Sequence, residues 1–281
     1  MIKKHMPETT VYRKKDNVGY ITCKALDKED WLLNAFSTRE GGISPGYYGE
    51  MNLSFTVGDA PENVRENYRL FGNAIGVTPE QMVTAAQTHT VNVLKVGKEY
   101  KGMGVVRERI YSDIDGLVTD EPGVCLVTSH ADCVPLYFAD RVKRCIGLSH
   151  SGWRGTVGGI GAKTVKLLEK EFGSNPKDLV CFIGPCISKE SYEVGEDVAL
   201  HFKNAYEPHR FEKICTPVEQ NEGKYLLDLL LANFYLLCDC GLKPENITLT
   251  DICTAENRDL LHSHRATGGK RGGMSAFLMI K

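Results

Sequence analysis

The sequence predicts an α+β protein in which helices cover layered β-sheets. Strand-like apolar runs recur from residue 18 to residue 280, whereas only three well-separated segments have a helical period. Strands that outnumber the helices in this way argue against a regular βαβ repeat. The 281 residues contain no repeat or low-complexity block, and they are enough to bury a large core. We therefore expect a single domain over residues 1–281, with the polar stretch 203–224 as the one weak candidate for a boundary.

Ten apolar runs have the composition and length of strands. They cover residues 18–25, 31–37, 82–96, 115–119, 124–128, 134–139, 144–149, 179–184, 246–252 and 274–280. The chain is therefore expected to be rich in strands.

Three segments have the helical period: 61–75, 157–172 and 225–240. In the first, Asp59 is placed to cap the helix and Pro61 lies near the first turn. Gly173 and Gly241 would end the other two. The third segment is almost wholly apolar but too short to span a bilayer, so we expect it to cover a sheet inside the fold.

Composition restricts the class of protein. Lys and Arg number 34 and Asp and Glu number 36, so the chain has no overall basic field for nucleic acid or an anionic membrane. Ten cysteines occur without paired C-x-x-C units, and the opening MIKKHMPETT is not followed by an apolar signal segment. No apolar run approaches the length of a membrane span. We expect a soluble cytoplasmic protein with mostly structural cysteines, Cys186 among them.

Three residues that commonly bind metals lie at or next to the ends of strand-like runs, namely His89, Cys133 and His150. Two histidines and one cysteine leave the fourth position of tetrahedral zinc open to water or substrate, as in a catalytic site. His130 competes with His89 for the third place, and a structural histidine is the alternative for His89. Copper is also possible, but no methionine stands nearby for the axial position of a blue-copper site.

Asp132 precedes Cys133 directly. A neighbouring negative charge raises the pKa of a thiol, so this cysteine would be a poor nucleophile. A metal reverses that effect, because zinc deprotonates a thiol that coordinates it. Asp132 itself is either a candidate acid/base group or a turn carboxylate.

Arginines accompany two glycine-rich segments. Arg39 ends a strand-like run and opens the loop at 37–54, which holds four glycines. Arg154, in GWRGT, lies at a predicted helix start, where amides and a guanidinium suit an oxyanion or phosphate. The alternative for Arg39 is a solvated surface arginine. In the basic C-terminal segment we expect at most Arg265 to face a site.

Taken together, these motifs resemble those of the YfiH/YlmD family. The resemblance covers about residues 30–280 and rests on the order of TREGGISPGYYGEMNLS, VGDAPENVRENYRL, QTHT, DIDGLVT, HADCVPL, SHSGWRGT, IGPCISKESYEVGEDV, DICT and HSHR. The family was first described as laccase-like multicopper polyphenol oxidases and is now regarded as purine nucleoside phosphorylases with adenosine deaminase activity. The fold implied is a four-layer αββα sandwich.

The resemblance also implies roles for single residues. His89, Cys133 and His150 would bind a catalytic zinc ion, and Arg39 would face substrate or phosphate. Binding of substrate and phosphate is expected from Arg39, Asn52, Arg154 and Arg265. The sequence departs from the family pattern in QTHT, and GGKRGGM replaces a common TGR, so Arg271 receives no role.

The function implied is phosphorolysis of adenosine, inosine and 5′-methylthioadenosine, with deamination of adenosine in which Asp132 is a candidate for moving the proton. The partners would be these nucleosides and phosphate, with neither nucleic acid nor a membrane, in a monomer or homodimer. Three rivals remain: a copper polyphenol oxidase, a cysteine hydrolase using Cys133 and His150, and a protein in which zinc only stabilises the fold. Too few histidines, eight in all, argue against multicopper chemistry.

Overall fold

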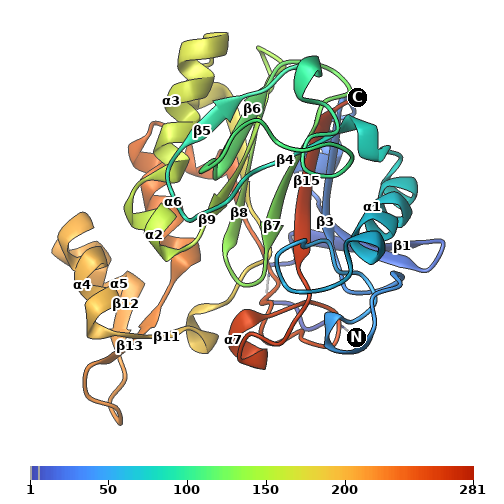
Figure 1. The fold of residues 1–281 in the computed structure, drawn as a ribbon. Coiled ribbons are helices and arrows are strands. Elements are labelled where there is room, and N and C mark those ends of the chain that lie inside the picture. The colour runs from blue at the N-terminus through green and yellow to red at the C-terminus, as the bar shows by residue number, and fades with distance from the viewer. Residues whose placement is uncertain (1, 6) are drawn as a thin grey trace.

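Two six-stranded β-sheets pack face to face in the computed structural model, and helices cover the outer face of each (Figure 1). The structure describes residues 2–5 and 7–281. The first sheet has the order β1 (Thr10–Lys15), β2 (Val18–Cys23), β3 (Leu32–Ser37), β15 (Met274–Ile280), β7 (Cys125–His130) and β4 (Met82–Thr84). The second has the order β14 (Ile247–Leu249), β10 (Leu179–Ile183), β8 (Val134–Asp140), β9 (Ile146–Ser151), β6 (Gly116–Thr119) and β5 (Val93–Lys95). The predicted α+β class and the four-layer αββα sandwich are confirmed.

Helices form the two outer layers. The helices of the described residues are α1 (Pro61–Ile75), α2 (Trp153–Val157), α3 (Ile160–Phe172), α4 (Glu196–Ala205), α5 (Pro208–Ile214), α6 (Leu229–Asp239) and α7 (His264–Thr267). Of these, α7 lies at an end of the sandwich and not in an outer layer (Figure 1). Helix α1 covers the first sheet, while α3 and α6 cover the second (Figure 1). A small third sheet has the order β11 (Glu193–Gly195), β13 (Lys224–Leu227) and β12 (Cys215–Pro217). Helices α4 and α5 pack against this sheet, and α5 also contacts α6.

Alternation along the strands builds the layers, because successive side chains of a strand point to opposite faces of its sheet. In β7, Leu126 packs between the two sheets, whereas Val127 packs under α1. In β8, Tyr137 enters the central layer and Phe138 packs towards α3 and α6. These strands are buried on both faces, which explains why they appear in the sequence as continuous apolar runs.

Helix α6 is apolar on nearly all sides because it lies between two apolar surroundings. Leu229, Ala232 and Leu237 are buried against the second sheet and α3, and its other apolar side chains pack partly against α2 and α5. This confirms the expectation of a helix inside the fold. None of the helices described is both long and apolar enough to cross a membrane.

The predicted strand at 82–96 is wrong as a single element. β4 ends at Thr84 in the first sheet, and β5 begins at Val93 in the second. The residues between them cross from one sheet to the other. The crossing includes the polar run QTHT at 87–90, so the apolar pattern is interrupted there, although the prediction joined the apolar residues on either side into one strand.

Two helix predictions need correction at their starts. The segment predicted at 157–172 is divided into α2 and α3, because Gly159 takes a left-handed conformation with φ 77°. The segment predicted at 225–240 begins as β13, and α6 starts only where the Asp228 side chain accepts a hydrogen bond from the Leu231 amide. Asp59 does not cap α1, whose N-cap residue is Ala60.

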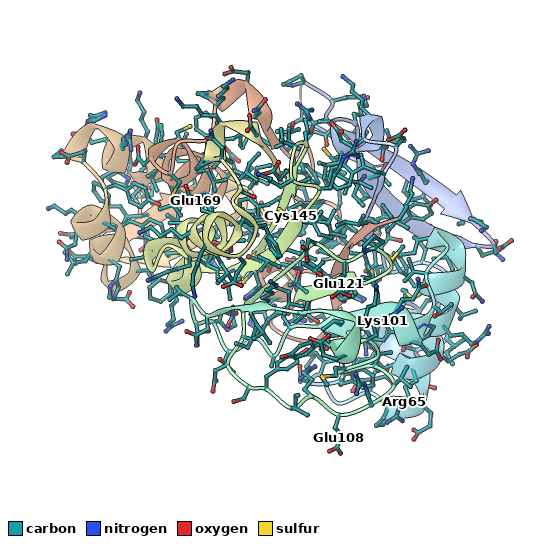
Figure 2. The ribbon with its side chains drawn as sticks, turned by 90° about the horizontal axis from the view of Figure 1, so that it is seen from above. Arg65, Lys101, Glu108, Glu121, Cys145 and Glu169 are labelled. Atoms are coloured by element: carbon teal, nitrogen blue, oxygen red, sulfur yellow. The ribbon has the colours of Figure 1, made fainter. Side chains whose placement is uncertain are left out.

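The cysteines behave largely as expected. Seven of the ten are buried, and all ten are free thiols. Seen from above in Figure 2, Cys145 lies inside the molecule, whereas Glu108 points outward from the loop between β5 and β6. β1 and the elements from β11 to β12 were not predicted, because their polar or short sequences carry little periodic signal.

One buried amide ties α1 to the glycine-rich loop. Asn67 donates to the hydroxyl of Ser44 and to the carbonyls of Glu50 and Asn52, at 2.8–3.2 Å, and accepts the amide of Ile43 at 2.9 Å. Asn67 is fully buried, so water cannot replace these bonds. Asn67 therefore fixes the loop against α1.

We expect Asn67→Ala to lower the free energy of unfolding by about 2–4 kcal/mol, because several buried groups lose their partner. Urea denaturation measures the change. Asn73→Ala is the control, since Asn73 lies exposed on the same helix and should change stability by about 0.5 kcal/mol or less. Equal effects of the two substitutions would contradict the role given to Asn67.

Candidate metal centre

The chain crosses from the first sheet to the second at two places, and both crossings occur at the same end of the sandwich. One crossing joins β4 to β5 and carries His89; the other joins β7 to β8 and carries Cys133. β4 and β7 are parallel neighbours, so their carboxyl ends meet at this edge. His150 lies near the end of β9, paired with Pro135 at the start of β8. The topology therefore brings the three predicted ligands together.

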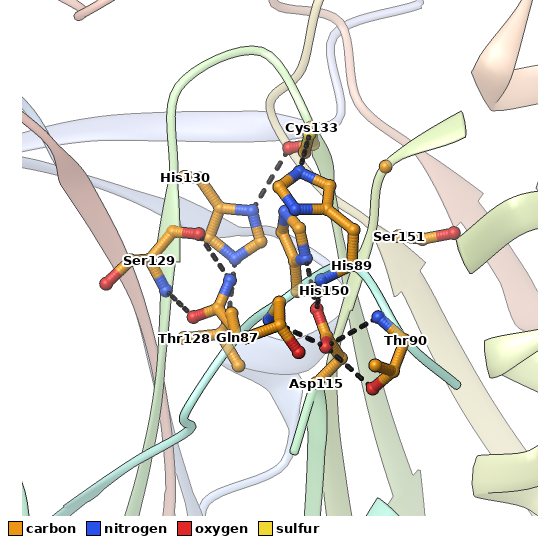
Figure 3. A network of polar contacts seen from close by, with 12 residues as sticks. Gln87, His89, Thr90, Asp115, Thr128, Ser129, His130, Cys133, His150 and Ser151 are labelled. Atoms are coloured by element: carbon orange, nitrogen blue, oxygen red, sulfur yellow. Dashed lines mark hydrogen bonds and ion pairs between the residues drawn. The ribbon is translucent and has the colours of Figure 1, made fainter. Parts of the chain in front are cut away.

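The ligand atoms of His89, Cys133 and His150 all lie within 4.8 Å of one another (Figure 3). The Cys133 Sγ is 3.9 Å from the His89 Nε2. Zinc binds imidazole nitrogen at about 2.0–2.1 Å and thiolate sulfur at about 2.3 Å, so one ion between these atoms is compatible with their spacing. His150 is buried, Cys133 half-buried and His89 exposed, which leaves the centre accessible from one side.

Asp115, at the start of β6, organises two of the three residues. Its carboxylate accepts the His150 Nδ1 at 2.8 Å, so that the Nε2 faces the centre. It also accepts the backbone amides of Thr88, His89 and Thr90 at 2.8–3.1 Å and the Thr90 hydroxyl at 2.9 Å. His89 has φ 63°, a left-handed conformation that these amide bonds hold in place. Burial opposes ionisation of Asp115, yet the donors lower its pKa to about 2.

The thiol and the imidazole of the centre form a charged pair. Burial would raise the pKa of Cys133, but the charges and hydrogen bonds of His150 and His89 lower it to about 6. Burial likewise disfavours the charged form of His150, while Cys133 and Asp115 raise its pKa to about 9. The thiolate, which is the form that binds metals, is therefore favoured at neutral pH.

His130 is not part of the triad. Its Nε2 lies 2.8 Å from the Thr128 hydroxyl and its Nδ1 lies 3.0 Å from the Cys133 carbonyl, so both ring nitrogens already have partners (Figure 3). Burial and then the charge of His150 hold its pKa well below the usual value. His130 instead supports the backbone that carries Cys133.

The centre opens into a cavity of about 680 Å³. Its lining includes the three ligands and four arginines, Arg109, Arg154, Arg265 and Arg271. None of the four forms a salt bridge with a carboxylate among the described residues. The cavity thus combines two histidines and a cysteine with four arginines that form no ion pair, and Asp113 and Asp132 also line it. The excess of positive charge suits an anionic or polar substrate.

The profile of the family described as "Multi-copper polyphenol oxidoreductase laccase" matches residues 33–281. The chain belongs to this family. The solved structures similar to this chain include YfiH of Bacillus licheniformis, with a TM-score of 0.89 and 30% identity over 96% of this chain and 99% of that one. YlmD of Geobacillus stearothermophilus has a TM-score of 0.87 and 31% identity, covering 98% and 100% of the two chains. The predicted YfiH/YlmD membership is therefore confirmed.

Relatives known from sequence carry an activity in their names. A Bacteroides thetaiotaomicron protein named purine nucleoside phosphorylase is 35% identical over 96% of this chain and 98% of its own length. Purine nucleoside phosphorylase YlmD of Bacillus subtilis is 34% identical over 89% of both chains. Both relatives align with nearly the whole of this member of the family.

Other predicted site residues also line the cavity. The guanidinium carbon of Arg154 lies 4.2 Å from the centre of the Trp153 ring, and that of Arg265 lies 4.9 Å from the Tyr192 ring. The Asp132 carboxylate accepts the Thr254 hydroxyl at 2.6 Å and the Arg265 amide at 2.7 Å. Each Asp132 oxygen therefore already accepts a hydrogen bond from the protein.

Two residues expected to bind substrate do not line the cavity. Arg39 donates to the Arg258 carbonyl at 2.8 Å, and its guanidinium packs against Gly49. Asn52 is fully buried: its Nδ2 donates to Asp59 and to the Ser54 carbonyl, and its Oδ1 accepts two backbone amides. The structure thus uses Asn52 to hold its own loop, because the side chain has no free group to offer.

Sequence reasoning missed the role of Asp115, although DIDGLVT was one of the family motifs. A carboxylate directly before a buried strand was the available signal, since such a group needs partners at the strand end. Arg109 and Arg271 were also missed as cavity residues. Their loops have no periodic pattern that places them.

We expect Asp115→Asn to weaken zinc binding by about 10- to 100-fold, because the carboxylate orients the His150 ring and the backbone of His89. Competition with a chromophoric chelator measures the affinity. Asp120→Asn is the control, because Asp120 lies exposed at the opposite end of β6. Equal zinc affinity in the Asp115 variant and the wild type would refute the orienting role.

Proposed function

We propose that this chain is a zinc-dependent purine nucleoside phosphorylase that acts on adenosine, inosine and 5′-methylthioadenosine and also deaminates adenosine. The observation that carries the proposal is the triad of His89, Cys133 and His150, open on one side to an arginine-lined cavity. The names of the relatives from Bacteroides thetaiotaomicron and Bacillus subtilis support the reaction class. The products of phosphorolysis would be a free purine and a ribose 1-phosphate or its methylthio analogue.

The triad would hold the metal. His89 Nε2, the Cys133 thiolate and the Nε2 of His150 form a donor set that suits zinc, and zinc when bound supplies a Lewis acid. Asp115 would keep the His150 ring oriented throughout turnover. The half-buried thiolate would also be protected from reaction by coordination.

Phosphorolysis breaks the bond between C1′ and the purine nitrogen and forms a bond from C1′ to a phosphate oxygen. The bonding electrons leave with the purine, which then takes up a proton, while positive charge develops on the sugar. Arg154 and Arg265 would hold phosphate near C1′, since guanidinium forks match its oxygens. Stacking on Trp153 and Tyr192 limits the motion of these two side chains.

Deamination replaces the amino group at C6 of adenine with oxygen from water and releases ammonia. Asp132 was a candidate for moving the proton. Because its two oxygens accept bonds from Thr254 and Arg265, a positioning role for Asp132 is better supported. It would fix the start of the loop that carries Arg265.

Several expectations that accompany this function stay predictions. They are a single domain over residues 1–281, a cytoplasmic location, a monomeric or homodimeric state, and the lack of nucleic-acid and membrane partners. The partners proposed are purine nucleosides and phosphate.

A cysteine hydrolase is a second candidate, because Cys133, His150 and Asp115 are arranged like a nucleophile, a base and the group that orients the base. Such an enzyme would remain active after the metal is removed. A copper polyphenol oxidase is less well supported: within the described residues, one group alone has three or more metal-binding side chains in range of a single ion.

We expect Cys133→Ala to lose phosphate-dependent release of hypoxanthine from inosine by at least about 100-fold, because the metal loses one of three ligands. Metal analysis of protein purified without added metal should give about one zinc per wild-type chain and much less in the variant. Cys238→Ala, on the outer part of α6, is the matched control and should keep both properties.

The two alternative functions predict different results in these experiments. Copper in the purified protein would favour the oxidase, and activity that survives chelation but not alkylation of Cys133 would favour the hydrolase. Full base release by Cys133→Ala would overturn the triad as the reactive centre.

A further inference from the structure

Arg271 is a partly buried cation that lacks a counter-ion. It lines the cavity, and its Nη1 donates to the carbonyl of Gly272 at 2.9 Å. Its Nε is buried and has no hydrogen-bond partner among the residues that the structure describes. Within the same residues no carboxylate oxygen lies within 4.0 Å of its guanidinium. A donor left in this state carries an uncompensated desolvation cost.

The backbone next to Arg271 is packed closely against the glycine-rich loop. The segment therefore cannot move outward and carry the guanidinium into solvent. A Cβ on Gly272 would lie 2.6 Å from the Tyr48 carbonyl, and one on Gly273 would lie 2.5 Å from the Ser54 Cβ. The Gly273 amide donates to the Asn52 Oδ1 at 2.8 Å, and the Gly273 carbonyl accepts the Leu53 amide at 2.9 Å. The glycine-rich loop therefore forms a cradle for the segment that carries Arg271.

The charges near Arg271 do not neutralise it directly. Burial lowers the pKa of Arg271, and the charges of Asp132 and Cys133 offset this only in part. Arginine stays charged at neutral pH all the same. Asp132 already accepts bonds from Thr254 and Arg265. The guanidinium thus lines the same cavity as the candidate metal centre, and the charge of Cys133 acts on it. It nevertheless keeps N–H donors without a partner for a ligand.

We propose that Arg271 is the buried phosphate-binding residue of this cavity and that the loop around Asn52 positions it. The ligand class is a tetrahedral oxyanion, for which the planar fork of arginine is well suited. The identification of that oxyanion as the co-substrate rests on the proposed phosphorylase function. Arg154 and Arg265 would then complete the phosphate site from the first turns of α2 and α7, whereas Arg39 remains outside it.

The test compares zinc-loaded wild type with Arg271→Gln, Arg271→Lys and the control Arg141→Gln. Arg141 pairs with Glu29 near the far end of β8, away from the cavity. Inorganic phosphate is titrated by isothermal calorimetry, and the KM values for phosphate and inosine are measured separately. We expect Arg271→Gln to weaken phosphate binding about 10- to 100-fold and to raise the KM for phosphate similarly, with little change in the KM for inosine. Arg271→Lys should lie between the two, because it keeps the charge without the fork.

Thermal unfolding gives a readout that does not depend on activity. Without phosphate, Arg271→Gln should be at least as stable as the wild type, because it removes an uncompensated buried donor. Phosphate should raise the melting temperature of the wild type and of Arg141→Gln but not that of Arg271→Gln. A purine nucleoside 5′-monophosphate, titrated in parallel, distinguishes a free phosphate site from one for a phosphate ester.

The outcomes separate this inference from the proposed function. Unchanged phosphate affinity in Arg271→Gln, or no phosphate binding by the wild type, would overturn the inference. Tighter binding of the monophosphate than of phosphate, dependent on Arg271, would overturn the co-substrate assignment. Phosphate binding that depends on Arg271, in a protein that releases no purine from any nucleoside, would support the site and refute the phosphorylase.

Discussion

The hydrogen bonds of one carboxylate, that of Asp115, hold the candidate centre together. The side chain lies at the start of β6 in the second sheet. It accepts hydrogen bonds from the backbone amides of residues 88–90, on the segment that crosses from the first sheet. Without these bonds, the left-handed backbone at His89 would have no local support, and the His150 ring would lose its orientation. The hydrogen bond and the charge of Asp115 also raise the pKa of His150. The same interaction therefore serves local folding, ligand geometry and the charge state of the centre.

The sandwich explains why the centre lies where it does. Its interior is filled by large apolar side chains between the sheets, so polar ligands can gather only at an end. Both crossings from the first sheet to the second meet at that end. The cavity takes Arg109 and Arg271 from loops and Arg154 and Arg265 from the first turns of α2 and α7. Of the candidate ligands, His150 lies within β9, whereas His89 and Cys133 lie on the crossings and are held by hydrogen bonds to Asp115 and His130. The arginines need separate anchors. Stacking anchors Arg154 and Arg265, and a glycine-tight segment anchors Arg271.

The sequence predicted the layered class and the three ligands because both depend on local patterns. Buried strands appear as apolar runs, and His89, Cys133 and His150 stand where those runs stop. The choice between His89 and His130 was open, since only tertiary contacts show that both nitrogens of His130 have partners. The sheet crossing at 85–92 was missed because the polar run QTHT at 87–90 is short, and a local pattern does not show that the apolar residues on its two sides belong to different sheets. Arg271 could not be placed, because its neighbours come from a loop more than 200 residues away.

The glycine-rich loop at 37–54 has a structural role that differs from the substrate-binding role expected for Arg39 and Asn52. The loop does lie against another segment, because Tyr48 and Ser54 approach Gly272 and Gly273, and Asn52 accepts the Gly273 amide. Its own glycines face other neighbours, such as the Asn17 carbonyl at Gly41 and the Arg39 guanidinium at Gly49. Asn67, Asn52 and the loop form a continuous chain of buried hydrogen bonds from α1 to that backbone. A residue such as Asn52 can therefore matter to the cavity without reaching it, because it fixes the segment from which Arg271 extends. The loop therefore acts indirectly. It determines the position of the Arg271 guanidinium beside the candidate metal ligands, and in the proposed site the guanidinium itself binds phosphate.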